Sequence, residues 1–460
     1  MANTFLQRNF TNTPTSQTTM TYSFWVKKSA LATGNSNKGI FGHVEIGNAG
    51  NSNLQVGWTT NNDFQIGYYS NNGSDTHIDY VTNAQFKDNN GWYHVCIEIN
   101  TTLATADDRV KLYINGVLVT SYSTRSNPPQ NRTINTGNMY MYIGQYRQTG
   151  GTEIYLDGLL SEFIHSDGYA YSASTFGETD TDTGEWRIKD NPTFTPGNQG
   201  FKILSNGSTI TDQSAGSNDF TVAGGTLTNT NDCPSNVFAT LNSLDSDLTT
   251  DPFQYGNTKV SGQNPESAKY YCGLTLGMMG NGKYYFEGQL NVNNQGILGV
   301  CNLDASDNPT YLRQQNTFPG RYSSSWGYDF TDGYKFNNNN KTAYGSGTSW
   351  TANDYFSFAL DNTNGKMYIA KNGSWVSGGD PTNGTGGIDY SAIGDNNMFI
   401  VADNNSAGYN KFTFNFGNGS FDTTTLSTTY SPTVGDTSAK FKYNIIPTGY
   451  TALSTKGLNT

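Results

Sequence analysis

Short runs in which apolar and polar residues alternate recur along the whole chain, and most are bounded by Gly, Asn, Ser or Thr. Successive side chains of a β-strand point to opposite faces, so a period of two predicts strands with one buried face. No segment keeps an apolar stripe at helical spacing long enough to predict a helix. The sequence therefore predicts an all-β fold of antiparallel strands.

Two of these runs are interrupted by Asn-Gly: VKLYINGVLV at 110–119 and KMYIAKNGSWV at 366–376. A type I′ turn needs positive φ at both central residues, which Asn and Gly tolerate. We therefore expect tight hairpins at Asn115-Gly116 and Asn372-Gly373. Valine in place of either glycine is expected to disrupt its hairpin, because valine resists positive φ.

The alternating runs fall into two groups, separated by a polar stretch from about Gly177 to Asp251 that is rich in Thr, Asn, Asp and Ser. A chain of 460 residues suits two or three domains. The predicted organisation is a first β-domain at 1–220, a connector at 221–255, a second β-domain at 256–440 and a C-terminal tail at 441–460.

The amino-acid composition disfavours two classes of binding partner. The formal net charge of −11 disfavours binding to a nucleic-acid backbone, and the absence of a basic cluster longer than Lys27-Lys28 disfavours an anionic membrane surface. No apolar run is long enough for a transmembrane helix, and the N-terminal residues lack the apolar core of a signal peptide. Without CxxC spacing or a signal peptide, the cysteines are predicted to be free buried thiols. They are Cys96, Cys233, Cys272 and Cys301.

Motifs for catalysis are missing. Glycoside hydrolysis needs two carboxylates on one face. The nearest candidates are Glu153 and Asp157, which share strand parity in TEIYLDGLLSE, whereas Glu162 falls on the other face. There is no HExxH motif for zinc and no GxSxG elbow for a serine hydrolase. The sequence therefore predicts a protein that is not an enzyme. The scattered histidines are His43, His77, His94 and His165.

Calcium is the one metal that the loops could hold through Asp and Asn oxygens. Loop aspartates are, however, commonly turn formers or caps. We assign no ligands and predict no cofactor, with a structural Ca²⁺ left as an alternative. The loop candidates are Asp107, Asp108, Asp167 and Asp180.

Glycan binding needs an exposed ring that stacks on a sugar, with amide or carboxyl groups that bond its hydroxyls. Thirty tyrosines and abundant Asn supply both. The alternative for every candidate is a place in a core. The predicted ligand-binding residues are Trp58, Tyr68, Tyr69, Tyr334 and Tyr344. The tryptophans assigned to cores are Trp25, Trp92, Trp326 and Trp350.

The first half resembles a LamG-type, concanavalin A-like jelly roll. The order of TYSFWVKKS, GWYHVCIEINTT, DDRVKLYINGVLVTS, MYIGQYR and IYLDGLLSEFIHSDGYAYSASTFGE carries this resemblance. The second half resembles a SPRY-type β-sandwich through GKYYFEGQLNV, ILGVCN, WGYDFTDGYKFNNN, NDYFSFALDNTNGKMYIAKNG and FTFNFGNGSF. In SPRY-type sandwiches, loops at one end commonly bind peptides, which makes Asn337–Asn340 and VSGGDPTNGTGGIDY candidate contacts or plain solvated loops.

Together the two halves are similar to structural proteins of tailed, often marine, bacteriophages. The resemblance implies a non-enzymatic virion protein, assembled in the host cytoplasm and displayed on the particle as a tail-fibre or appendage adhesin for host glycans. It also implies other virion proteins as partners and a homo-oligomer. Without heptads or collagen-like repeats, a compact decoration or tip is expected. Two alternatives are a capsid (head) decoration protein of the same virion and an exported cellular carbohydrate-binding adhesin.

Overall fold

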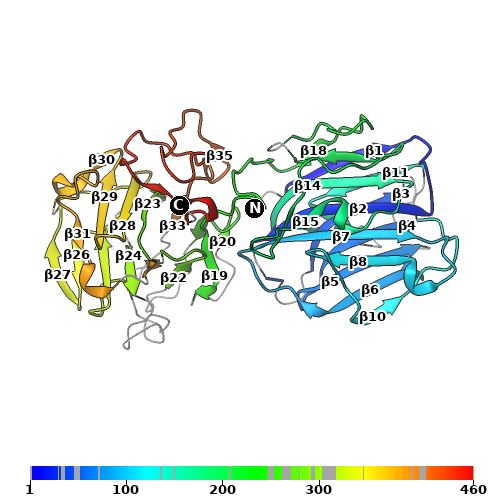
Figure 1. The fold of residues 1–460 in the computed structure, drawn as a ribbon, viewed down its shortest axis with the longest axis horizontal. Helices are drawn as coiled ribbons and strands as arrows, with labels where there is room; N and C mark the ends of the chain where they lie inside the picture. Colours follow the sequence, from blue (N-terminus) through cyan, green and yellow to red (C-terminus); the bar gives the residue numbers. More distant parts are fainter. Residues whose placement is uncertain are drawn as a thin grey trace. The chain divides into compact units, whose positions relative to one another are not determined.

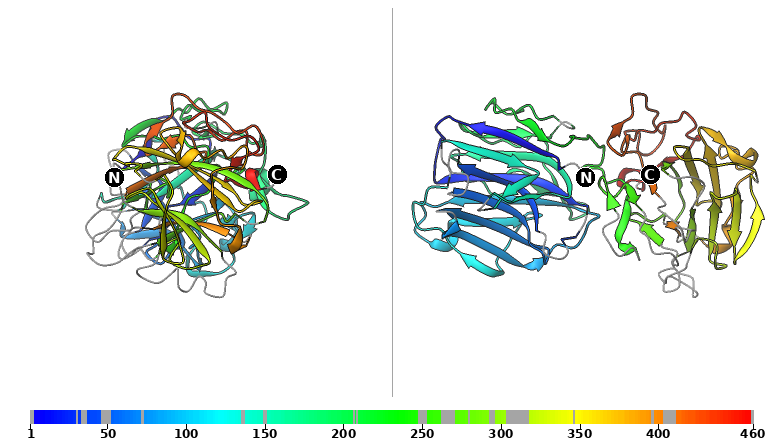
Figure 2. Two further views of the ribbon diagram at one scale, coloured as in Figure 1. Left: turned by 90° about the vertical axis from the view of Figure 1, so that its left-hand side faces the viewer. Right: turned by 180° about the vertical axis from the view of Figure 1, so that it is seen from behind.

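The computed structural model shows two compact units, Met1–Thr228 and Asn229–Thr460, and each consists of stacked β-sheets (Figures 1 and 2). The all-β prediction is confirmed. Within the described part of the chain, helix is limited to α1 (Thr455–Leu458) and short 3-10 turns. The described residues are 3–29, 31–32, 37–45, 52–70, 73–134, 137–148, 151–205, 207, 209–246, 253–261, 271–278, 280–291, 296–302, 318–345, 347–394, 397–402 and 411–458.

The N-terminal unit has two main antiparallel sheets. The eight-stranded sheet runs β10 (Tyr122–Ser126), β6 (Asp75–Gln85), β5 (Asp63–Ser70), β4 (Ser52–Trp58), β3 (Lys38–Glu45), β11 (Met139–Ile143), β1 (Phe5–Phe10) and β18 (Thr221–Gly224). The six-stranded sheet runs β17 (Phe201–Ile203), β14 (Gly158–Asp167), β2 (Thr19–Lys28), β7 (Trp92–Asn100), β8 (Val110–Ile114) and β9 (Val117–Leu118). Smaller elements are the hairpins β12 (Gln145–Arg147) with β13 (Glu153–Tyr155) and β15 (Gly177–Thr179) with β16 (Trp186–Ile188), and the 3-10 turns at Ala106–Asp108 and Ala173–Thr175.

Aromatic rings join these two sheets. Phe41 of β3 lies 5.5 Å from Phe24 of β2 and 5.2 Å from Phe163 of β14, between ring centroids. All three side chains are fully buried. Each large ring removes much apolar surface from water, so this contact between the sheets is a main source of stability.

The C-terminal unit also has two main sheets. The seven-stranded sheet runs β19 (Leu241–Ser246), β22 (Tyr271–Leu274), β32 (Asn397–Ala402), β24 (Ile297–Asn302), β25 (Ser325–Asp329), β26 (Tyr334–Asn337) and β27 (Asn340–Ala343). The nine-stranded sheet runs β20 (Phe253–Gln254), β21 (Lys259–Ser261), β33 (Lys411–Asn415), β23 (Lys283–Leu290), β28 (Tyr355–Asp361), β29 (Lys366–Lys371) and β30 (Ser374–Trp375), with β31 (Ile388–Asp389) on β29 and β36 (Thr451–Ala452) on β23. Smaller elements are β34 (Ser420–Phe421) with β35 (Thr424–Thr425), and 3-10 turns at Val376–Gly378 and Ser391–Ile393.

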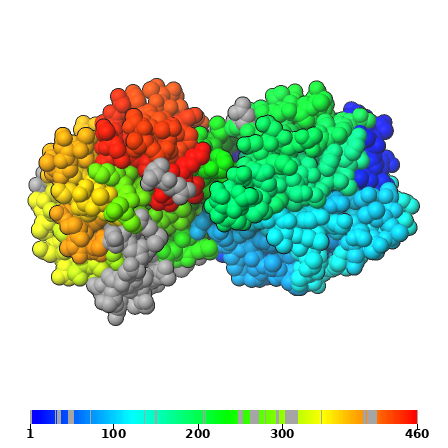
Figure 3. Space-filling view, viewed as in Figure 1, coloured from blue at the N-terminus to red at the C-terminus, as the bar shows by residue number. Residues whose placement is uncertain are grey.

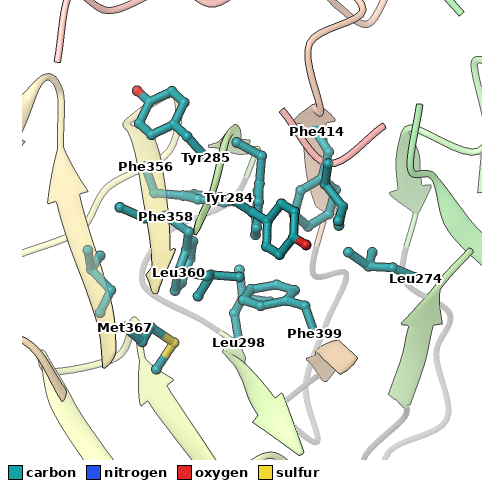
Figure 4. Close-up of a cluster of buried hydrophobic side chains, with 14 of the residues drawn as sticks. Leu274, Tyr284, Tyr285, Leu298, Phe356, Phe358, Leu360, Met367, Phe399 and Phe414 are labelled. Atoms are coloured by element: carbon teal, nitrogen blue, oxygen red, sulfur yellow. The ribbon is translucent and has the colours of Figure 1, made fainter. Parts of the chain in front are cut away.

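The core of the C-terminal unit is again built from aromatic rings (Figure 4). Along each strand these rings alternate with residues that point outward. Phe286 of β23 and Phe358 of β28 contact Phe399 of β32, with centroids 4.8 and 4.9 Å apart. Tyr284 and Tyr285 leave β23 on opposite sides (Figure 4). Alternation along the strand therefore gives this sheet a core face and an outer face.

The two units share one strand plan. In the N-terminal unit one sheet contains β14-β2-β7-β8-β9, and the C-terminal unit has β33-β23-β28-β29-β30 in its place. The other sheets contain β6-β5-β4-β3-β11-β1 and β27-β26-β25-β24-β32-β22. These eleven strands follow the same order along the chain in both units. Sequence comparison of the halves shows no residue-by-residue repeat, because a strand plan depends on alternation and turns and not on particular side chains.

The observed boundaries differ from the predicted connector and tail. β18, at 221–224, pairs with β1 and extends the eight-stranded sheet. β19, at 241–246, and β20, at 253–254, belong to sheets of the C-terminal unit. Tyr450, Ala452 and Leu453 of the predicted tail are fully buried in that unit. Polar segments can extend a sheet because backbone pairing does not require apolar side chains.

Both Asn-Gly hairpins form and make the same contacts. Asn115 and Asn372 have φ of 48° and 47°, and the following glycines have φ of 78° and 83°. The side-chain oxygen of Asn115 accepts the N–H of His94 at 2.8 Å, and that of Asn372 accepts the N–H of Tyr355 at 2.8 Å. Each asparagine N–H donates back to the carbonyl of the same residue. Asparagine therefore ties its turn to the neighbouring strand.

A ring covers the glycine of each hairpin. A Cβ on Gly116 would lie 2.4 Å from the Trp186 ring, and a Cβ on Gly373 would lie 2.8 Å from the ring of Tyr443. Trp186 belongs to the segment after β14, which covers the outer face of the six-stranded sheet and contributes green surface in Figure 3. Glycine is thus needed for both conformation and space.

The C-terminal segment covers the outer face of the nine-stranded sheet through a buried carboxylate. Glu287 accepts the backbone N–H groups of Lys442 and Tyr443 at 2.7 and 2.9 Å. The Tyr285 hydroxyl donates to it at 3.0 Å. Burial nevertheless raises the pKa of Glu287 to about 7.

Three histidines of the N-terminal unit are buried and neutral. Burial lowers the pKa of His43 and of His94 to about 3, and the pKa of His165 to about 4. The Nδ1 atom of His165 lies 3.2 Å from the carbonyl oxygen of Thr21. Protonation would place a positive charge among apolar side chains, which the fold disfavours.

Gly116→Ala tests the ring contact apart from backbone strain. We expect it to destabilise the N-terminal unit by about 1–2 kcal/mol for positive φ and by about 1–3 kcal/mol more for overpacking against Trp186. Gly184→Ala is the matched control, because its φ is 75° but nothing lies within 4 Å of the new Cβ. The measurement is urea unfolding. Equal losses for the two variants would contradict the packing contribution.

The buried groups predict opposite responses of the two units to acid. Between pH 7 and 5 the unfolded N-terminal unit takes up protons on histidines that remain neutral when folded, so this unit loses stability as the pH falls below 6.5, by about 1.4 kcal/mol per histidine and pH unit. Over the same range folded Glu287 takes up a proton and its unfolded form does not until about 4.5, so the C-terminal unit gains stability.

The midpoint of urea unfolding, followed for each unit by mass spectrometry of protease-released peptides, measures both shifts on the full chain. Glu287→Gln should remove the pH dependence of the C-terminal unit and leave that of the N-terminal unit unchanged. Shifts of the same sign in both units would show that other groups dominate.

Candidate functional site

Three of the five predicted ligand-binding residues are buried. Trp58, Tyr68 and Tyr344 are 1%, 1% and 6% exposed. Trp58 follows Leu54 and Val56 at strand spacing and therefore shares their inward face, where the ammonium of Lys28 lies 4.7 Å from its ring centroid. These three side chains pack in the cores and do not offer a surface to a ligand, which corrects the sequence-based assignment.

Tyr334 lies on the outer face of the seven-stranded sheet but is covered. The ammonium of Lys341 lies 5.0 Å from its ring centroid and also pairs with Asp329 at 3.5 Å and with Asp332. A sugar that stacks on this ring would have to displace a lysine held by two carboxylates. Tyr334 is therefore less suited to stacking on a sugar than its position in the sequence suggests.

Tyr69 is the predicted residue whose ring is placed for stacking. Along β5 the side chains of Phe64, Ile66 and Tyr68 enter the core, so Gln65, Gly67 and Tyr69 share the outer face. A Cβ on Gly67 would lie 2.4–2.8 Å from ring atoms of Tyr69. The half-buried ring therefore lies across the glycine, and the absence of a side chain there allows it to lie against the backbone.

Strand register places polar groups around this ring. Gln55 of β4 and Asp79 of β6 are the partners of Gly67 on the two neighbouring strands. The Gln65 amide lies 3.5 Å from the Tyr69 hydroxyl and 3.4 Å from an oxygen of Asp79. We call Gln55, Gln65, Tyr69 and Asp79 the Tyr69 platform. Sequence reasoning missed its three polar members, although strand parity with Tyr69 was the signal that could have found Gln65.

Burial favours the neutral form of the Tyr69 side chain. Burial, aided by the nearby charge of Asp79, raises the pKa of Tyr69 to about 12, so its hydroxyl keeps its proton at neutral pH. Burial also raises the pKa of Asp79, and the hydrogen bond from Gln65 opposes that shift. The platform thus offers one ring face together with amide donors and carboxyl and amide acceptors.

The β12–β13 hairpin bounds the platform on one side. Added Cβ atoms on Gly39, Gly42 and Gly57 would all approach Tyr146 within 3.1 Å. Gly39 and Gly57 are partners across β3 and β4. Because these glycines have no side chains, the Tyr146 ring packs directly on the outer face of the sheet. The hairpin therefore covers the centre of the sheet.

Each of the two predicted catalytic carboxylates lies beside a cation. Glu153 lies in β13 and pairs with Arg147 at 2.6 Å, whereas Asp157 precedes β14 and lies 3.5 Å from the ammonium of Lys38. The two carboxylates are therefore on different elements, each beside its own cation. Glu162 is 3.2 Å from Lys202.

A buried Ser-His pair occurs under the β15–β16 hairpin but is oriented against catalysis. The indole N–H of Trp186 lies 3.0 Å from Nδ1 of His94, which must accept because an indole only donates. The neutral ring then carries its proton on Nε2, 2.9 Å from the Ser23 hydroxyl. His94 therefore donates to Ser23 and is not placed to take its proton.

The loop aspartates have protein partners. Asp107 pairs with Arg125, Asp108 with Lys111 and Asp180 with Arg187, while Asp167 accepts the backbone N–H groups of three residues. Among the described residues no group of three or more His, Cys, Asp or Glu side chains is placed to hold a metal ion. None of the four cysteines takes part in a disulfide; Cys233 is half-buried and the others are buried.

The helices in the described ranges are too short and too polar to cross a membrane. Residues 6–168 match the family model of the concanavalin A-like lectin/glucanases superfamily, of the laminin G type. This match lies within the N-terminal unit and is a similarity of that part of the chain. No curated protein sequence matches the chain.

Solved structures similar to parts of this chain include the following three. The SPRY domain of human HERC1 is 15% identical over 38% of this chain and 96% of its own, with a TM-score of 0.28. A heptameric SAP-like pentraxin from Limulus polyphemus is 16% identical over 45% and 90%, with a TM-score of 0.30. Stonustoxin is 13% identical over 38% and 27%, with a TM-score of 0.27. Scores this low identify no function.

Proposed function

We propose that the N-terminal unit binds a neutral polysaccharide through the Tyr69 platform. The observation that carries this proposal is the half-buried Tyr69 ring, which lies against Gly67 on the outer face with Gln55, Gln65 and Asp79 on the same face. A flat ring stacks on the apolar C–H face of a sugar, and the amides and carboxyl exchange hydrogen bonds with its hydroxyls. The lectin/glucanase family match agrees with this class of ligand.

We further propose that the protein is a non-enzymatic structural component of a tailed-phage virion, displayed on the particle as an appendage that attaches to host-surface glycans. The resemblance of both halves to such proteins supports this role, and it implies other virion proteins as partners and a homo-oligomer. Glu153 and Asp157 lie on different elements and each is paired with its own cation, which favours binding over hydrolysis. Head decoration and an exported cellular adhesin are the competing roles.

Tyr69→Ala tests the binding site. We expect at least a tenfold weaker affinity for the neutral polymer that the wild-type chain binds best on an array of bacterial and algal polysaccharides, because about 1.4 kcal/mol of stacking is removed. Binding is measured by biolayer interferometry on the full chain. Tyr69→Phe keeps the ring and should retain most of the affinity.

Tyr169→Ala is the matched control, because Tyr169 is 39% exposed and lies outside the eight-stranded sheet. It should bind like the wild type. Binding by Tyr69→Ala that equals the wild type, or no binding of the wild type to any neutral polymer, would contradict the proposed site. An unchanged unfolding midpoint of Tyr69→Ala separates lost contact from lost fold.

Electron microscopy of purified particles with a gold-labelled antibody tests the virion role. We expect label at the tail. Label over the head would support the decoration role, whereas particles without label in a lysate that contains the protein would argue against a virion component.

A further inference from the structure

We infer that the same sheet face carries a second aromatic platform, on β1 and β11, and that the ligand is an extended polymer that spans both. This inference rests on the proposed binding of a polysaccharide at Tyr69. The second site, here called the Tyr140 platform, comprises Gln7, Asn9 and Tyr140, and the Tyr142 side chain is buried beside it. Its ring and amides are the side-chain types found in the Tyr69 platform.

Strand register places these residues on the outer face. Leu6 and Phe10 of β1 and Met139, Met141 and Ile143 of β11 enter the core. The alternate residues therefore point outward: Gln7 opposite Tyr142 and Asn9 opposite Tyr140. The ring centroids of Tyr140 and Tyr142 are 6.3 Å apart, with an interplanar angle of 30°. Tyr140 is half-buried and Asn9 is exposed, so a ligand can reach both.

The register also aligns the two platforms. Across the sheet Tyr140 pairs with Val44, Val44 with Asn53, and Asn53 with Tyr69. The two tyrosines are thus in one row, three strand spacings or about 14 Å apart. This separation is longer than one sugar ring. A single chain that stacks on both must be several residues long and cross the β12–β13 hairpin.

Charges beside the second platform are already paired, which selects a neutral ligand. The guanidinium of Arg147 lies 4.9 Å from the Tyr142 ring centroid and 2.6 Å from an oxygen of Glu153. The Tyr155 hydroxyl donates to the other oxygen of Glu153. An anionic polymer would have to compete with Glu153 for Arg147, whereas a neutral one leaves the pair intact.

Tyr140→Ala tests the second platform on the full chain. The probe is the neutral polymer that binds best in the array, hydrolysed and separated by length. We expect Tyr140→Ala to weaken binding of long chains about tenfold and to leave di- and trisaccharides unchanged, because short ligands reach only one platform. Tyr140→Phe should behave like the wild type, and Tyr169→Ala remains the control.

The outcomes separate the two proposals. If Tyr69→Ala loses affinity for every length but Tyr140→Ala loses none, the Tyr69 site stands and the second platform is wrong. Equal losses of Tyr140→Ala for short and long chains would also overturn the spanning polymer. If the wild type binds no neutral polymer, the proposed function itself fails.

Discussion

Alternation of side chains along each strand is the constraint on which the rest of the structure depends. Because every sheet buries one face against its partner, its other face has to be covered or left to solvent. Residues after β14, with Trp186, cover the six-stranded sheet, and the C-terminal segment tied to Glu287 covers the nine-stranded sheet. Within the described residues, the β12–β13 hairpin covers the centre of the eight-stranded sheet, and half-buried rings and amides flank it.

One strand plan serves both units because its determinants are local. An Asn-Gly turn sets the same φ angles in each unit, and the asparagine side chain repeats the same bond to the neighbouring strand. The surrounding side chains are otherwise free to differ. Thus Gly116 is covered by Trp186 and Gly373 by Tyr443, from segments that follow the corresponding strands β14 and β33. The units differ mainly in what lies on their outer faces.

The sequence predicted the fold class and both hairpins well, since period and turn chemistry are local properties. It predicted the site poorly. Trp58 and Tyr69 looked equivalent as rings in strands, yet they lie on opposite faces, because which face is buried depends on the partner sheet. Gln55 and Asp79 come together only through pairing on either side of β5. The position of the β12–β13 hairpin could not be predicted either, because the glycines on which it packs come together only through the pairing of two strands.

The glycines of the eight-stranded sheet determine where an aromatic ring can pack against its outer face. At Gly39, Gly42 and Gly57 the missing side chains admit Tyr146 from a neighbouring hairpin, which closes that part of the face. At Gly67 the same absence admits the half-buried ring of Tyr69 from its own strand. A ring held in this way loses little conformational freedom when it binds, so most of the stacking energy goes into affinity. The absence of glycine side chains therefore accounts for both the covered centre and the Tyr69 platform on the same sheet.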